Sequence, residues 1–155
     1  MEPTISGDQY LLVNKLIYMS FPAGKIARVI PFLDIEQDRT YRLFRPPKRG
    51  EIIVSHFPRD DSRDIIKRVI GVPGDLIELR GGSVIVNGTP LDEPYIELLG
   101  HSTMATIQVP HNHYFVLGDN RINSNDSRSW GPLPDHLVVG KAWLSYWPFS
   151  QLDVF

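Results

Sequence analysis

Cysteine is absent from the 155-residue sequence. The chain therefore has no disulfide, no thiolate nucleophile and no cysteine metal ligand. Long apolar runs are also missing, because charged residues and prolines interrupt every stretch that approaches the ~18 residues of a membrane-spanning helix. The net charge is only -2, so the composition offers no basic surface for nucleic acid. These absences leave a globular domain without cysteine chemistry or nucleic-acid binding.

Proline and glycine are frequent and spread along the chain, which favours many short elements over long helices. Asn87-Gly88 predicts a type I′ hairpin turn, and Pro73-Gly74 predicts a type II turn. One helical turn is expected over residues 133–139, and a weak strand over 27–30. Short apolar runs predict strands over 10–13, 51–56, 64–70, 76–79, 83–86, 106–109, 114–117 and 140–146. Together they predict one mainly β, antiparallel domain over residues 1–155.

Lys67 is embedded in an apolar stretch, IIKRVIGV. Residues two apart in a strand share a face, so Lys67 would lie beside Ile65 and Val69. A lysine on such a face loses water, which disfavours its charged form and lowers its pKa toward that of a general base. Alternation alone does not decide whether Lys67 or Arg68 points inward. A lysine at a sheet edge that extends its amine to solvent is the alternative.

Residues 118–131, GDNRINSNDSRSWG, contain almost no apolar side chain. A calcium loop that starts at Asp119 or Asn123 lacks the glycine at position six and the glutamate at position twelve. Asp126 and Arg128 are two residues apart and can form a bidentate pair. The segment is thus either a solvated connection or a hydrogen-bonded network that can hold a neutral lysine in position.

The histidines and the aromatic tail give weaker signals. His111 and His113 can share a strand face, but no third metal ligand has convincing spacing. The other histidines have no local partner that favours a serine, histidine and aspartate triad. We expect neither a metal ion nor a cofactor. The aromatic residues of 143–149 suit a core strand or, if exposed, the edge of a bilayer.

Four motifs in this chain resemble, in order, those of the type I signal peptidases, membrane-bound serine proteases that remove signal peptides from exported proteins. The family's S-M-x-P-T-L-x-x-G-D is similar to MEPTISGD at 1–8, and its R-G-D-I to RGEI at 49–52. Its K-R-x-x-G-x-P-G-D is matched at 67–75, and G-D-N-R-x-x-S-x-D-S-R-x-W-G at 118–131. The short stretch 88–110 resembles the compact members, which have no large second domain.

The resemblance implies a serine–lysine dyad in which an unprotonated lysine accepts the proton of a serine that attacks the scissile carbonyl. Lys67 matches the general base, and Ser124 matches the serine that orients this lysine. The matched supporting network comprises Asp119, Asn120, Arg121, Asp126 and Arg128.

The same resemblance places the nucleophilic serine immediately before the methionine of the first motif, which is Met1 here. A serine two residues further upstream can donate to the oxyanion, and a membrane helix precedes both. Ser6 lies too far from this place to substitute. We therefore expect the chain as printed to be a truncated soluble domain, without its nucleophile and catalytically inactive.

The implied substrates are signal peptides of exported preproteins, cut after Ala-x-Ala and bound as an added strand. Met1, Ile5, Ile65 and Ile66 match the walls of the small substrate pockets, although each suits the core equally well. The implied setting is the cell membrane, with an upstream anchor and the domain on the extracytoplasmic side. The alternatives are a non-enzymatic β domain that binds extended peptides or packs in a membrane complex, and a related serine–lysine maturation peptidase.

Overall fold

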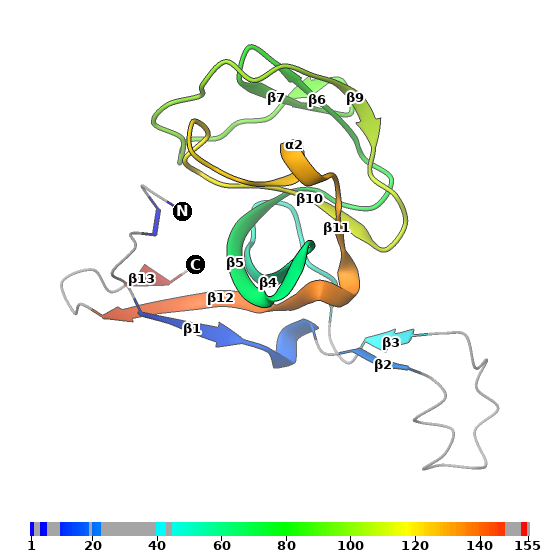
Figure 1. Ribbon diagram of the computed structural model, residues 1–155, viewed down its shortest axis with the longest axis vertical. Helices are drawn as coiled ribbons and strands as arrows, with labels where there is room; N and C mark the ends of the chain where they lie inside the picture. Colours follow the sequence, from blue (N-terminus) through cyan, green and yellow to red (C-terminus); the bar gives the residue numbers. More distant parts are fainter. Residues whose placement is uncertain are drawn as a thin grey trace.

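The computed structural model describes residues 1, 4–5, 10–18, 20–22, 40–42, 45–147 and 153–154. Their regular structure is dominated by antiparallel strands, which confirms the predicted fold class (Figure 1). The helical elements are η1 (Leu16–Tyr18), α2 (Ser127–Trp130) and η2 (Asp135–Leu137). None of the helices in this part of the chain is long and apolar enough to cross a bilayer. The strands are β1 (Tyr10–Asn14), β2 (Ser20–Pro22), β3 (Thr40–Arg42), β4 (Ile52–Phe57), β5 (Asp60–Gly71), β6 (Leu76–Arg80), β7 (Ser83–Val86), β8 (Thr89–Pro90), β9 (Met104–Gln108), β10 (His113–Leu117), β11 (Leu133–Pro134), β12 (Val138–Trp147) and β13 (Asp153–Val154).

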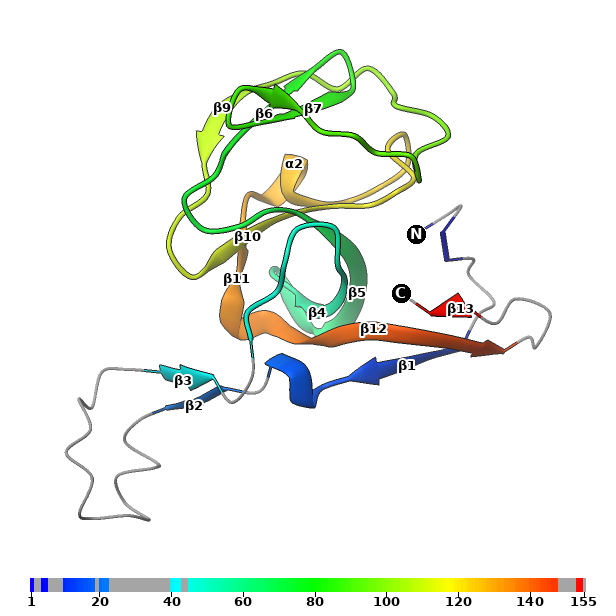
Figure 2. The same ribbon diagram turned by 180° about the vertical axis from the view of Figure 1, so that it is seen from behind.

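The larger sheet has the strand order β1-β12-β4-β5-β10-β11, and β13 also pairs with β12. Each of these pairings is antiparallel. The long strand β5 curls through the middle of the molecule together with β4 (Figures 1 and 2). The first half of β5, Asp60–Asp64, is exposed, whereas the half from Ile65 to Gly71 is half-buried or buried, so Lys67 and Arg68 lie against protein.

A four-stranded sheet, β8-β7-β6-β9, packs above β5 and β10 (Figure 2). The core between the two sheets joins Ile70 and Phe115 of the larger sheet to Ile77 and Val84 of the smaller one. All four side chains are at most 1% exposed. A separate two-stranded sheet pairs β2 with β3.

The two predicted turns are present. Asn87 has a φ of 52° and Gly88 a φ of 81°, which are the two positive values that a type I′ turn needs. Gly74 has a φ of 92°, and the Asp75 N–H donates to Val72 O at 3.0 Å, as in a type II turn. Local residue chemistry therefore decided both turns.

The eight strands predicted from short apolar runs are all found, with ends that differ by a few residues. The helical turn predicted over 133–139 is the 3-10 turn η2, and the weak strand over 27–30 lies outside the described residues. The strands not predicted are β2, β3, β8, β11 and β13, each two or three residues long. Such strands are too short to show alternation and form only because a partner strand is nearby.

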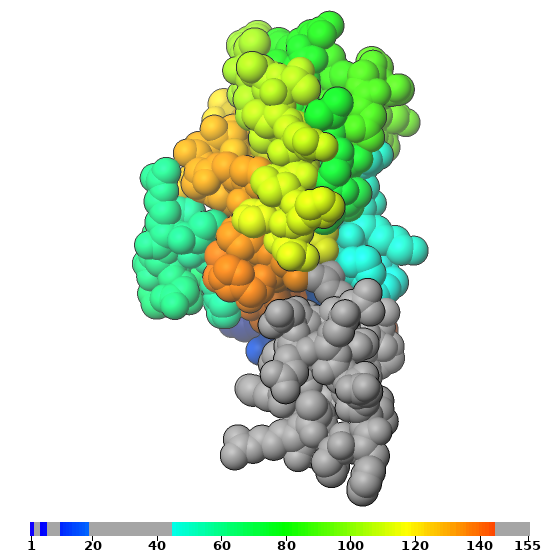
Figure 3. Space-filling view, turned by 90° about the vertical axis from the view of Figure 1, so that its right-hand side faces the viewer, coloured from blue at the N-terminus to red at the C-terminus, as the bar shows by residue number. Residues whose placement is uncertain are grey.

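The hairpin of β4 and β5 projects from the side of the molecule (Figure 3). Near its tip, the Phe57 ring meets Trp130 of α2 edge-on, with ring centroids 6.4 Å apart. Arg59 Nη2 donates to Ser129 O at 3.4 Å. The hairpin that leads into the strand of Lys67 is thus held against the polar segment 118–131.

Glu51, at the start of β4, collects several positive or donating groups. Its carboxylate accepts hydrogen bonds from the Tyr18 hydroxyl and from the Lys48 N–H, each at 2.8 Å. Both terminal nitrogens of Arg45 bind it, and Lys141 Nζ lies 3.8 Å away. Burial alone would raise the pKa of Glu51, but the hydrogen bonds lower it to about 2. We call Glu51 and these four residues the Glu51 cluster.

Candidate active site

The side chain of Arg68, which belongs to the motif at 67–75, contacts a residue of each of the other three motifs. Its guanidinium binds Asp119 through two hydrogen bonds, of 2.9 and 2.7 Å. It also donates to Gly50 O at 2.9 Å and to Thr4 Oγ1 at 3.4 Å. Thr4 Oγ1 in turn donates to the Asp119 carboxylate at 2.5 Å. Residues 1–8, 49–52, 67–75 and 118–131, far apart in sequence, are therefore joined at one point.

Lys67 and Arg68 occupy opposite faces of β5, and both are at least partly buried. Lys67 lies opposite Ile53 of β4, while Arg68 lies opposite Ile52. The sequence left open which of the two basic residues points inward. The answer is both, because protein covers each face of this central strand.

Lys67 and Ser124 approach each other across Gly118. A Cβ atom on Gly118 would lie 2.2 Å from Ser124 Oγ and 3.8 Å from Lys67 Nζ. Ser124 Oγ is buried and has no hydrogen-bond partner among the described residues. No ion pair joins Lys67 to a carboxylate in the same part of the chain. The site thus places an amine near a hydroxyl without a partner among the described residues, and only glycine at position 118 leaves room for this hydroxyl.

The environment of Lys67 favours its neutral form. Burial lowers the pKa of the Lys67 amine, and the positive charge of Arg128 acts in the same direction. The negative charges of Asp126 and Asp119 oppose this shift but do not cancel it. Each of these carboxylates is already bound by an arginine, so neither is left to pair with the lysine.

Asp126 and Arg128 form the bidentate pair that their spacing predicts. Arg128 Nε and Nη2 each donate to an Asp126 oxygen at 2.8 Å. Asp126 also caps α2 by accepting from the Arg128 N–H, and it accepts from the Gly118 N–H at 3.1 Å. Arg128 Nη1 reaches Ser102 Oγ at 2.9 Å and Arg121 O at 2.7 Å. This pair closes residues 118–128 into one hydrogen-bonded loop, which we call the catalytic loop.

Arg121 anchors the same loop to the segment between β8 and β9. Its Nε donates to Gly118 O at 3.1 Å, and its two terminal nitrogens bind Glu93 at 3.1 and 2.5 Å. The Tyr95 hydroxyl donates to Glu93 at 2.7 Å, and the Tyr95 ring centroid lies 3.8 Å from Arg68 Cζ. The Arg121 and Glu93 side chains are only 1% and 4% exposed.

Asn120 has a local role in this geometry. Its side-chain oxygen accepts a hydrogen bond from the Asn123 N–H at 3.1 Å, which closes a turn within the catalytic loop. Sequence reasoning did not select Thr4, Arg68, Glu93 or Tyr95 as site residues. The first two lie inside the motifs, whereas Glu93 and Tyr95 carry no local signal, because their burial arises only from tertiary contacts.

The four predicted pocket residues do not all come together. Ile5 is 4% exposed and packs with Ile52 and Ala142, and Met1 and Ile66 pack against this cluster. Ile65 is half-buried and lies outside the apolar clusters that the described residues form. Ile5 is therefore a core residue here, and Met1 and Ile66 are the ones beside it with exposed surface.

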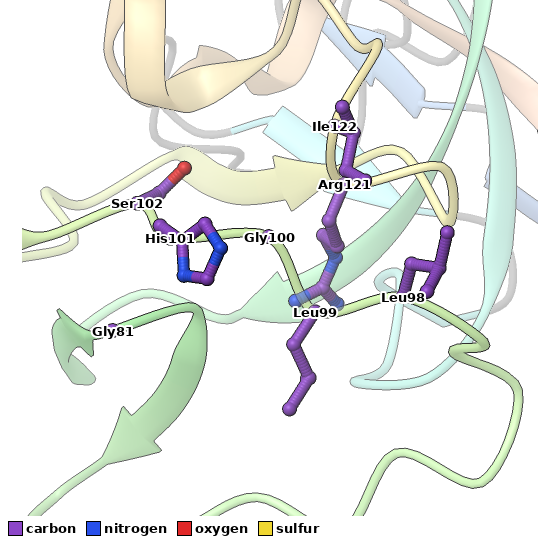
Figure 4. Close-up of a pocket in the computed structure, with 8 residues that line it drawn as sticks. All are labelled: Gly81, Leu98, Leu99, Gly100, His101, Ser102, Arg121 and Ile122. Atoms are coloured by element: carbon purple, nitrogen blue, oxygen red, sulfur yellow. The ribbon is translucent and has the colours of Figure 1, made fainter.

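A pocket of about 740 Å³ lies beside the catalytic loop (Figure 4). Leu98, Leu99 and Ile122 give it an apolar rim, and Arg121 extends from the loop toward the opposite segment. Neither Lys67 nor Ser124 lines it. Within the described ranges, no three acidic or histidine side chains gather in a way that could hold a metal ion.

A family model described as signal peptidase, peptidase S26, matches residues 1–147. Signal peptidase I of Leptolyngbya laminosa is 41% identical over 117 residues, which cover 70% of this chain and 57% of that protein. The probable signal peptidase I-2 of a Synechocystis strain is 36% identical over 99% of this chain and 62% of that protein.

A solved structure is also similar. The crystal structure of a signal peptidase I from Enterococcus faecalis V583 superposes with a TM-score of 0.55 at 33% sequence identity. The match covers 63% of this chain and 97% of that chain. The present chain spans about three fifths of the length of the Leptolyngbya and Synechocystis relatives. Because the family match covers nearly the whole chain and the four motifs converge in space, the protein belongs to the signal peptidase family, peptidase S26.

Proposed function

We propose that residues 1–155 form the catalytic domain of a type I signal peptidase, in which Lys67 is the general base of a serine–lysine dyad. The observation that carries this proposal is the half-buried Lys67, whose pKa is lowered, beside the unpartnered hydroxyl of Ser124. A binding module has no use for a neutral amine that is held apart from both nearby carboxylates. The family membership supplies the reaction class, which is serine endopeptidase.

The chemistry follows from the neutral amine. The hydroxyl of a serine placed immediately ahead of Met1 loses its proton to Lys67 Nζ while its oxygen bonds to the scissile carbonyl carbon. The resulting ammonium gives the proton to the leaving amine when the C–N bond breaks. Lys67 then accepts a proton from the water whose oxygen bonds to the acyl carbon, and it gives this proton to the serine oxygen when the ester C–O bond breaks. Ser124 Oγ, free of other partners, accepts a hydrogen bond from Lys67 Nζ and orients it.

The supporting network keeps Lys67 neutral and in place. Arg68 neutralises Asp119, and Arg128 neutralises Asp126, so neither carboxylate captures the amine. Asn120 and Arg121 shape the catalytic loop from which Ser124 projects. This division of roles explains why a polar loop is needed around a base that must lose its charge.

The proposed substrates are signal peptides of exported proteins, bound as an extended strand beside Ile65, Ile66 and Met1. Met1 and Ile66 are only partly buried, so their side chains can narrow a pocket to the size of alanine. A pocket with such an apolar wall excludes large side chains of the substrate, and polar side chains of the substrate contribute little binding free energy there. Cleavage after Ala-x-Ala is the expected specificity.

The proposed location is the cell membrane, with the domain on the extracytoplasmic side and an anchor elsewhere in the whole protein. Members of this family are membrane-associated. Tyr10 and Leu12 of β1 and Trp143 of the adjacent β12 are exposed, and such residues suit a bilayer interface. Vesicle co-sedimentation should weaken for Trp143→Ser, whereas equal binding by both proteins would contradict this surface.

The deciding experiment is cleavage of a peptide with an Ala-x-Ala site. The chain is extended ahead of Met1 by the family's serine-bearing segment, and the chain that begins at Met1 is the matched control. We expect cutting after the second alanine only by the extended chain, and its loss in Lys67→Ala. Silence from a folded extended chain would instead support a peptide-binding module, and cutting by the control would place the nucleophile elsewhere.

A further inference from the structure

A buried polar bridge outside the four motifs connects both anchoring points of the catalytic loop. The loop begins at Asp119, which is held by Arg68, and continues to Arg121, which is held by Glu93. Tyr95 contacts both Arg68 and Glu93, because its ring stacks on the Arg68 guanidinium and its hydroxyl donates to Glu93. The two anchors are thus coupled through a single aromatic side chain.

The geometry of the bridge fixes the orientation of the side chains that it joins as well as the distances between them. A guanidinium over a ring face, with its centre 3.8 Å from the ring centroid, leaves Arg68 little freedom to rotate. Arg68 holds both oxygens of Asp119, and Arg121 holds both oxygens of Glu93. Bidentate pairs define the plane of each partner, so a shift of Tyr95 changes the orientation of the loop.

The loop in turn fixes the surroundings of Lys67. Arg121 Nε donates to Gly118 O, and Gly118 is the residue whose missing side chain makes room for Ser124 Oγ, close to Lys67 Nζ. Figure 4 shows the Arg121 side chain extending from the loop toward the Leu99 segment. A displacement of Arg121 is therefore transmitted to the carbonyl of Gly118, next to the amine.

We propose that Tyr95 and Glu93 are positioning residues, which hold the catalytic loop in register with Lys67 by bridging Arg68 and Arg121. This inference rests on the proposed function only in taking Lys67 as the base. The charged groups that act on Lys67 from the packed elements are Asp119, Asp126 and Arg128. Of these, Asp119 is the one that the bridge holds through Arg68.

The chemistry of Tyr95 fits this task. Burial raises the pKa of the Tyr95 hydroxyl, and the hydrogen bond to Glu93 raises it further. The hydroxyl therefore stays protonated at neutral pH and donates to Glu93. Tyr95 takes no part in proton transfer, and its effect on the reaction passes through Arg68 and Glu93.

The test uses substitutions that separate the ring from the hydroxyl. Tyr95→Leu removes the stacking and the hydrogen bond, whereas Tyr95→Phe keeps the stacking. Glu93→Gln weakens the interaction with Arg121 and keeps the size of the side chain at position 93. Glu78→Gln is the matched control, because it breaks the exposed pair with Arg80 on the smaller sheet.

The first readout needs no peptidase activity and uses the chain as printed. Acetic anhydride labels only neutral amines, so the pH dependence of Lys67 acetylation, followed by mass spectrometry, reports the pKa of this side chain. We expect Tyr95→Leu to shift the midpoint most, Tyr95→Phe and Glu93→Gln to shift it less because each breaks one link of the bridge, and Glu78→Gln to leave it close to that of the unmodified protein. An unshifted midpoint in a folded Tyr95→Leu overturns the proposal.

The second readout is cleavage of the Ala-x-Ala peptide by the serine-extended chain. We expect Tyr95→Leu to lower kcat by about 10- to 100-fold with little change in KM, as for a displaced reacting group, and Tyr95→Phe, which keeps the stacking, to lower it less. An equal loss of kcat in Tyr95→Phe and Tyr95→Leu contradicts the role of the stacking. If Tyr95→Leu does not fold, Glu93→Gln decides, since an unchanged Lys67 midpoint in that variant overturns the bridge.

Failure of this inference is distinguishable from failure of the proposed function. If the extended chain does not cleave, the acetylation experiment still reports whether Tyr95 controls Lys67. If it cleaves but Tyr95→Leu behaves as the unmodified protein in both readouts, the peptidase stands and the positioning role is wrong.

Discussion

The Glu51 cluster and the catalytic loop are two polar clusters that act on the charge at their centre in opposite ways. In the Glu51 cluster, one carboxylate receives hydrogen bonds from Tyr18, Lys48 and Arg45, so the charge is fully compensated. Around the catalytic loop, Asp119 and Asp126 each have an arginine, yet the described residues offer no such partner to Lys67 or to the Ser124 hydroxyl. The first arrangement stabilises a charge, and the second isolates an amine.

This contrast explains how the site lowers the pKa of Lys67 although two carboxylates lie nearby. A lysine close to two carboxylates would ordinarily keep its proton. Here Arg68 and Arg128 occupy these carboxylates, and burial then dominates. The lowered pKa of Lys67 thus depends on the two arginines, which bind the carboxylates that would otherwise pair with its amine.

The largest expected effect comes from removing the isolated amine. In the serine-extended chain, Lys67→Met should lower kcat by about 10²- to 10⁴-fold, the usual contribution of a general base. Its melting temperature at neutral pH should equal or exceed that of the unmodified protein, because a buried amine without an ion-pair partner is replaced by an apolar chain. Lys141→Met, in the Glu51 cluster, is the control and should retain activity. A marked loss of stability in Lys67→Met would show that Lys67 is a paired structural residue.

Breaking the compensated cluster should act on stability. Glu51→Gln should lower the free energy of unfolding at pH 7 by about 1 to 3 kcal/mol, since a carboxylate with a strongly lowered pKa is replaced by a neutral amide. The pKa of Glu51 falls from 4.5 to about 2 on folding, so its contribution is present above pH 4.5 and is lost as the pH falls toward 2. Urea unfolding at several pH values measures this. A Glu51→Gln curve parallel to that of the unmodified protein between pH 2 and 5 would contradict the assignment.

The pH dependence of catalysis sharpens the same contrast. Because burial lowers the pKa of Lys67, kcat/KM should rise with pH and level off well before the ordinary lysine value of 10.5. Folding stability should also rise with pH between the lowered pKa and 10.5, because the unfolded chain binds more protons there. Initial rates of the serine-extended chain across this range provide the measurement. A rate that still climbs at pH 10 would mean that Lys67 is solvated.

The smallest effect concerns two serines whose hydroxyls are buried without a partner, Ser124 and Ser55. Replacing either by alanine removes an unsatisfied polar group and should raise the free energy of unfolding by up to about 1 kcal/mol. Only Ser124→Ala should reduce kcat, by about tenfold, because it loses the hydrogen bond that Ser124 accepts from the amine of Lys67 only in the proposed reaction. Equal activity in both variants would remove Ser124 from the mechanism.

The sequence predicted those parts of the fold whose cause is local. The strand expected over 64–70 and the Asn87-Gly88 turn depend on neighbouring residues, and both are present in the structure. The spacing of Asp126 and Arg128 likewise predicted their pairing. The inward orientation of both Lys67 and Arg68 was not predictable from alternation, because it requires protein on both faces of the strand.

Glu93 and Tyr95 show the limit most clearly. They lie in an irregular segment between β8 and β9, where a glutamate and a tyrosine ordinarily face solvent. Their burial comes from Arg121 and Arg68, which are distant in sequence. Similarly, Ile5 matches a pocket wall by motif, but its packing against Ala142 makes it part of the core.

The pairing of β1 with β12 has a consequence for how the molecule is assembled during synthesis. Tyr10 pairs with Trp147 and Asn14 with Lys141, so β1 has no partner strand until nearly the whole chain has left the ribosome. Strands β4 to β7, by contrast, form hairpins between neighbours in sequence and can fold early. The β4–β5 hairpin that contains Lys67 can therefore pair before β1 finds its partner strand.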